Sequence, residues 1–132
     1  MKRLIFEPEH EQLRATAREF LAREVAPYAD QWLRDGQVDR EVYKKAGAVG
    51  LLGFNVPEEY GGGGAMDDFR FNAVVVEEFA RFGGTAPGLS LQNDVVAPYF
   101  VHLADDEQMK RWMPGIATGE TILAVAMTEP GA

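Results

Sequence analysis

The sequence predicts an all-α fold: a compact bundle of about five to six helices with a short C-terminal strand stub. Apolar residues recur at the three- and four-residue spacing of one helix face, most clearly in residues 8–26 and 67–82. Proline and glycine divide the chain into segments of helix length. The apolar run of residues 122–127, close to the C-terminus, is the one segment typical of a strand.

The first helix is predicted to begin at Pro8, because proline lacks the N–H group that a first helical turn leaves unpaired. Four apolar residues share one face of it: Leu13, Ala17, Phe20 and Leu21. Pro27 should bend or end this helix. A second, short helix is predicted over residues 28–34, with Gly36 after its end.

The next helix is expected to be capped by Asp39, and Gly47 and Gly50 frame its exit. Residues 51–57 are predicted to be an extended connection, too short and proline-ended for a central strand. Residues 58–64, which end in four consecutive glycines, are predicted to form a loop.

The central helix is predicted to be capped by Asp67 or Asp68 and to run to about Phe82. Its apolar residues fall on two stripes, so it should be buried between neighbouring helices. One stripe holds Met66, Phe69, Ala73, Val76 and Ala80, and the other holds Val75, Phe79 and Phe82.

Two helical pieces should then meet near Ala97 and Pro98, and Asp105 or Asp106 should cap a last short helix that ends at Trp112.

These elements divide the chain into a helical domain, residues 1–118, and the incomplete start of a second domain, residues 119–132. The apolar run at 122–127 has no partner strand in the sequence. We therefore expect the chain to be the front piece of a longer protein.

Composition excludes several classes of function. The chain has 132 residues, 21 acidic and 13 basic, for a net charge of −8, so neither nucleic acid nor an anionic membrane is an expected partner. Cysteine is absent, which excludes disulfides and thiolate chemistry. No secretory signal and no apolar run of about 20 residues occurs, so the predicted location is cytoplasmic.

No self-sufficient catalytic set and no metal site is predicted. His10 and His102 stand outside any HExxH pattern and should be surface or half-buried side chains. The glycine run lacks the Gly-Lys-Ser/Thr continuation of a phosphate loop. Glu77 and Glu78 point about 100° apart on a helix, so we expect them to face solvent or pair with Arg81.

Several sequence strings, taken together, resemble the N-terminal helical domain of the acyl-CoA dehydrogenase family in order and spacing. They are PEHEQLR at 8–14, AGAVGLLG at 46–53, PEEYGG at 57–62, VEEFA at 76–80, DEQMKRWMP at 106–114, TGE at 118–120 and MTEPGA at 127–132. The last string, which follows an apolar segment, is the most specific.

The resemblance implies a three-part parent chain: this helical domain, a middle β-domain and a C-terminal helical bundle. Family members bind FAD and oxidise the Cα–Cβ bond of a fatty acyl-CoA thioester, as in fatty acid β-oxidation. A glutamate base removes the α-proton while hydride passes to the flavin. That base belongs to the C-terminal part, so no catalytic residue is expected here. The resemblance also implies an electron-transfer acceptor as partner and a homotetrameric or homodimeric parent.

Two sets of binding residues follow from the resemblance. Cofactor binding is expected at Val125, Met127 and Thr128, through backbone groups and the threonine hydroxyl. The alternative is that they belong to the β-domain core. Because only one wall of the flavin site would be present, we expect no tight FAD binding by this chain alone.

Substrate binding is expected at Leu91, Gln92 and Val95, which correspond to the helix at the far end of the acyl pocket. The alternative is ordinary core packing. Gln92 replaces the small residue often found there, which disagrees with a simple straight-chain substrate.

Two further functions stay open. The chain could be a self-standing helical interaction module, or the N-terminal domain of a related flavin oxidase or monooxygenase. The unpaired apolar segment argues against the module, because an uncovered strand edge promotes aggregation.

Overall fold

The computed structural model describes residues 4–83 and 87–131, and the regular structure in these residues is entirely helical. The α-helices are α1 (Pro8–Phe20), α2 (Ala29–Asp35), α3 (Glu41–Ala48), α4 (Arg70–Phe82), α5 (Ala97–Leu103) and α6 (Asp106–Thr118). Shorter turns are η1 (Leu21–Val25) and η3 (Leu91–Val96), both π-helical, and the 3₁₀ turn η2 (Glu58–Tyr60). The predicted all-α fold is confirmed.

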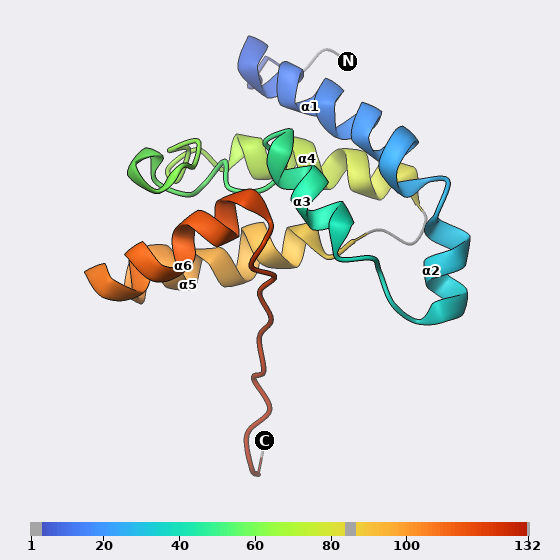
Figure 1. Ribbon diagram of the computed structural model, residues 1–132. Coiled ribbons are helices and arrows are strands. Elements are labelled where there is room, and N and C mark those ends of the chain that lie inside the picture. The colour runs from blue at the N-terminus through green and yellow to red at the C-terminus, as the bar shows by residue number, and fades with distance from the viewer. Residues whose placement is uncertain (1–3, 84–86, 132) are drawn as a thin grey trace.

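The predicted strand stub is wrong for the residues that the structure describes. After α6 the chain runs extended and away from the helices (Figure 1), and residues 119–131 contain no strand. A strand needs a partner whose backbone groups complete the ladder, and the helical part offers none. The boundary between predicted domains 1–118 and 119–132 stays a prediction, and residues 1–3 and 132 lie outside the described part.

A first hydrophobic cluster lies under α1, with α4 alongside that helix (Figure 1). The predicted apolar face of α1 is confirmed, since Ala17 and Phe20 are buried in this cluster and Leu21 continues it into η1. The cluster also receives Val42 and Ala46 from α3. This packing joins α1, α3 and α4.

A second, smaller cluster lies where α5 meets α6. Its buried members are Val56, Ala97, Met113, Ile116 and Ala117. Leu123, in the extended segment, packs against this cluster. The start of that segment is therefore part of the folded structure.

The predicted cap of α6, Asp105, is confirmed, whereas the cap positions of α3 and α4 are Arg40 and Phe69, and the predicted Asp39 and Asp68 lie one residue earlier. Asp39 accepts the Glu41 N–H at 2.9 Å and Asp68 accepts the Arg70 N–H at 3.0 Å. Asp105 and Gln108 form a reciprocal capping box at the start of α6.

The last helix is longer than predicted, because α6 continues past Trp112 and through Pro114 to Thr118. Proline costs a helix one hydrogen bond. Burial of Met113 and Ile116 on either side of it offsets that loss.

The burial of α4 also differs from the prediction. Met66, Phe69 and Val76, expected on a buried stripe, are exposed. The buried residues of α4 are Val74 and Val75 together with two polar residues, Asn72 and Glu78.

No helix in residues 4–83 and 87–131 has the length and apolar character needed to cross a membrane.

Candidate functional site

The point where the chain leaves the helical bundle is held tightly by backbone contacts. Gly119 ends α6 in the left-handed conformation, with φ 77°. A Cβ on Gly119 would overlap the carbonyl of Tyr43, and one on Gly47 would overlap the carbonyl of Thr118. The C-terminal end of α6 therefore lies directly on the backbone of α3, which only glycine permits.

Gln92, in η3, holds the same exit point from another direction. Its side chain is 1% exposed. Nε2 donates to the carbonyl oxygens of Thr121 at 3.2 Å and Ile116 at 3.5 Å, and Oε1 accepts the Leu123 N–H at 3.2 Å. The Thr121 N–H in turn donates to the Gly115 carbonyl at 2.9 Å. We call residues 119–128 the exit segment.

The three predicted cofactor-binding residues lie further along the exit segment. Val125, Met127 and Thr128 are all exposed, Met127 by 69%. Within the described ranges, none of them forms a hydrogen bond with the helices. They are therefore presented to solvent by a segment whose base is fixed. Their role in cofactor binding stays a prediction.

The three predicted substrate-binding residues divide into two kinds. Leu91 and Val95, one helical turn apart, are 43% and 38% exposed. Gln92 is buried, with both polar atoms of its amide engaged by the backbone. The structure thus leaves the two apolar side chains accessible to a ligand.

The sequence reasoning missed a group of buried polar side chains next to Gln92. Asn93 donates to the Leu51 carbonyl at 2.9 Å, and Asn55 donates to the Asn93 carbonyl at 2.7 Å. Asp94 accepts a 2.6 Å bond from Asn72, and burial raises the pKa of the Asp94 carboxyl. The available signal was three consecutive polar residues, 92–94, inside an apolar helical stretch.

His10 is also more buried than predicted, at 0% exposure. Its Nδ1 accepts the Glu7 N–H at 3.0 Å, so Nε2 carries the proton donated to Asp68, 3.1 Å away. Bonds from Arg70 hold the pKa of the Asp68 carboxyl well below its usual range. Glu7, Glu9 and His10 bring possible metal-ligand atoms within 4.8 Å, but the cap of α1 and Asp68 already engage both imidazole nitrogens.

Glu78 is buried and pairs with Arg81, so of the two expected arrangements the ion pair with Arg81 is confirmed and exposure to solvent is not. It is 3% exposed, and Arg18 donates to both of its oxygens at 2.9 Å. Arg14 and Arg81 lie 3.4 and 3.5 Å from Oε1. The hydrogen bonds from Arg18 lower the pKa of the Glu78 carboxyl most, and the hydrogen bond from Arg14 lowers it further. The carboxylate therefore joins α4 to α1.

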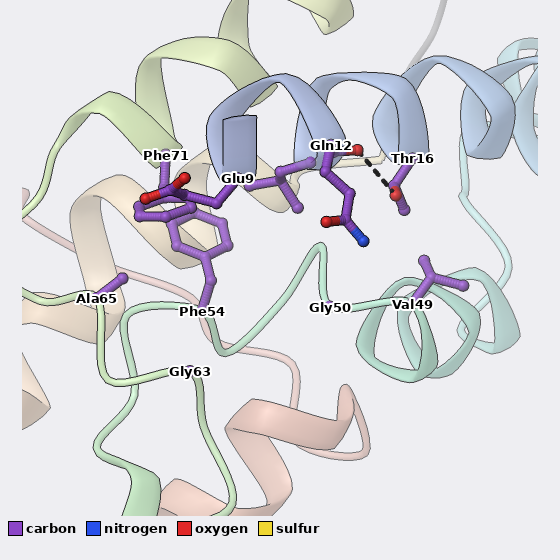
Figure 2. Close-up of a pocket in the computed structure, with 10 residues that line it drawn as sticks. Glu9, Gln12, Thr16, Val49, Gly50, Phe54, Gly63, Ala65 and Phe71 are labelled. Carbon is purple, nitrogen blue, oxygen red and sulfur yellow. Dashed lines mark hydrogen bonds between the residues drawn. The ribbon is translucent and has the colours of Figure 1, made fainter. Parts of the chain in front are cut away.

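A hollow of about 270 Å³ opens between α1 and the loop that follows α3 (Figure 2). Side chains of Gln12, Thr16 and Phe54 face it, and among the described residues that line it only Glu9 is charged. Ligand pockets usually exceed about 300 Å³. None of the six predicted site residues lines this hollow, and its charge disfavours an anionic ligand.

Comparison with known proteins gives consistent matches. The family model described as acyl-CoA dehydrogenase, N-terminal domain, matches residues 7–120. A long-chain specific acyl-CoA dehydrogenase, mitochondrial, of Rattus norvegicus is 44% identical over 130 residues. That alignment covers 98% of this chain and 30% of the rat protein. The chain thus spans less than a third of this relative.

Solved structures agree with the sequence comparison. The crystal structure of an acyl-CoA dehydrogenase from Geobacillus kaustophilus matches with TM-score 0.88 and 38% identity, over 99% of this chain and 34% of that one. An acyl-CoA dehydrogenase from Bacillus anthracis, complexed with FAD, matches with TM-score 0.80 and 33% identity, over 100% of this chain and 22% of that one.

Proposed function

The chain belongs to the acyl-CoA dehydrogenase family, and on that premise we propose that it is the N-terminal helical part of an FAD-dependent acyl-CoA dehydrogenase. The parent enzyme would remove hydrogen from the Cα–Cβ bond of a fatty acyl-CoA thioester. The observation that carries this proposal is the family match over residues 7–120. This chain contributes one wall of the site and no catalytic base.

The exit segment fits a role in holding FAD. Residues 124–131 are exposed, so their backbone N–H and C=O groups are accessible to a ligand, as is the Thr128 hydroxyl. A flavin edge requires such donors and acceptors on a fixed element. Val125, Met127 and Thr128 would supply them, and bound FAD would supply the acceptor for a hydride.

Leu91 and Val95 are the proposed contacts for the acyl chain. Both are apolar, partly exposed and on the same face of η3. Apolar surface of this kind favours a hydrocarbon chain over a charged group.

Partners and location belong to the same proposal. The parent would pass electrons to an electron-transfer acceptor and would form a homotetramer or homodimer. The sequence favours a cytoplasmic location, whereas the rat relative is described as mitochondrial.

The test uses the protein encoded by the complete reading frame. We expect it to purify with a visible flavin spectrum that bleaches when acyl-CoA is added without oxygen. In that protein, Thr128→Val should weaken flavin retention, and Thr16→Val, a half-buried threonine on α1 outside the exit segment, should not. A protein without flavin, or flavin that no acyl-CoA bleaches, would refute the proposal.

The same experiment separates the alternatives. An oxidase would reoxidise its reduced flavin with O₂ alone, producing hydrogen peroxide. A self-standing helical module would show neither flavin nor acyl-CoA dependence.

A further inference from the structure

The contacts of Gln92 with the exit segment resemble those of a strand partner. Its Nε2 donates to the carbonyl of Thr121, and its Oε1 accepts the N–H of Leu123, two residues later. In a parallel ladder, one residue binds its neighbour strand through the same two groups, on either side of the residue opposite. The Gln92 carboxamide thus takes the place of the N–H and C=O groups of one residue in a neighbouring strand.

This pair of bonds determines the register of the exit segment. Side chains of an extended segment alternate between two faces. Leu123 packs on the second hydrophobic cluster, so strand-like alternation would place Val125 and Met127 on its face and Thr128 on the other. A slip by one residue would exchange the two faces.

The anchor also determines the direction of the segment. Thr128 lies five residues beyond Leu123, about 16 Å along an extended chain. A rotation of about 10° at Leu123 would displace Thr128 by roughly 3 Å, whereas binding sites require placement within about 0.5 Å. A small change at Gln92 would therefore be amplified at the outer residues.

We propose that Gln92 is a positioning residue of the flavin site, whose carboxamide fixes the register and direction of residues 121–128 without touching the cofactor itself. The claim that the positioned residues bind flavin rests on the proposed function. The claim that Gln92 fixes the register of residues 121–128 rests on its hydrogen bonds alone.

The first experiment measures hydrogen exchange of the Leu123 amide in the full chain. Gln92→Leu removes all three hydrogen bonds of the carboxamide, including those to Thr121 and Leu123, at nearly constant volume, and we expect Leu123 to exchange at least tenfold faster. The matched control is Asn93→Leu, which removes an equally buried amide from the same helix but one bonded to Leu51. Equal acceleration in both variants, or none in Gln92→Leu, would overturn the inference.

Gln92→Glu adds a pH readout that a purely space-filling role would not produce. As a carboxylate it keeps the acceptor for Leu123 but faces two carbonyl oxygens, so its pKa should rise. Protonation restores a donor, and Leu123 protection should return to the wild-type value at acidic pH. Protection that is lost at every pH, or retained at every pH, would contradict the role of the carboxamide.

The second experiment uses the flavin-bound parent. Gln92→Leu should alter the visible flavin spectrum and lower kcat more than it raises KM, and Asn93→Leu should leave the spectrum unchanged. An unaltered spectrum in Gln92→Leu would refute the link to flavin. If the parent carries no flavin at all, the proposed function fails while the exchange experiment still decides the register.

Discussion

Glu78→Gln tests whether a buried carboxylate holds α1 on α4. Three guanidinium groups, of Arg14, Arg18 and Arg81, surround Glu78, and removing one partner of a buried ion pair costs about 3–5 kcal/mol. That figure must be reduced here, because Arg18 is 60% exposed and exposed pairs contribute about 0–1 kcal/mol. Arg14 also keeps a 2.7 Å bond to Glu77. We therefore expect a loss of about 2 kcal/mol.

The assay is urea unfolding at pH 7, followed by tryptophan fluorescence and circular dichroism. Glu19→Gln is the control, because its carboxylate forms an exposed pair with Arg23 and should contribute less than about 0.5 kcal/mol. A loss below about 0.5 kcal/mol for Glu78→Gln would refute the reasoning.

The pH dependence provides a second check on Glu78. Hydrogen bonds from Arg18 lower its pKa in the folded state, so its contribution is present above the unfolded value of about 4.3. The contribution is lost as pH falls through the lower folded pKa. The stability difference between wild type and Glu78→Gln should therefore shrink below about pH 4. A constant difference down to pH 2.5 would contradict this mechanism.

Three further predictions follow from the described contacts. Gly47→Ala should lower the free energy of unfolding in urea by about 1–3 kcal/mol, because its Cβ would overlap the Thr118 carbonyl. The control Gly88→Ala has room for a Cβ and should be neutral. A Gly47→Ala variant that is more stable than wild type would contradict the close approach of α3 and the end of α6. Asp68→Asn should lower the free energy of unfolding by about 1–2 kcal/mol at pH 7, and the exposed control Asp67→Asn should change it almost not at all. Bonds from Arg70 lower the pKa of the Asp68 carboxyl, so this difference should persist until strongly acidic pH. A difference that is already lost at pH 5 would contradict the role of Asp68. In a fluorescence titration the chain alone should not saturate with FAD at micromolar concentrations, because only one wall is present, and micromolar saturation would contradict that account.

The helices were predictable because their starts and ends depend on local chemistry. Pro8 and the Asp105 cap act on residues within one turn, and Gly36 ends α2 in the left-handed conformation that glycine favours. The break between η3 and α5 falls at Ala97, next to Pro98, as expected. Local signals of this kind need no knowledge of the rest of the fold.

The misses depend on partners that are distant in the sequence. Glu78 is buried because Arg18, 60 residues earlier, supplies its counter-charge, and the sequence contains no sign of that pairing. The segment after Gly119 has strand composition, but a strand requires a ladder, so it stays extended.

The roles of the candidate site residues stay a prediction, and the structure shows only their exposure and contacts. Leu91, Val95 and the outer exit segment are exposed, as residues that bind ligands must be. The engagement of Gln92 with Thr121 and Leu123 could not be predicted, because it depends on how η3 and α6 pack together.

The close approach of Gly47 and Gly119 to neighbouring backbones has a consequence for engineering chimaeras. The path of the chain beyond Gly119 is set jointly by α3, η3 and α6, which are separate in sequence. Transplanting α6 with its downstream residues into another scaffold would discard two of the three supports. A successful graft must carry all three elements together, and crossover points are safer in the loop between α2 and α3 than at residue 119.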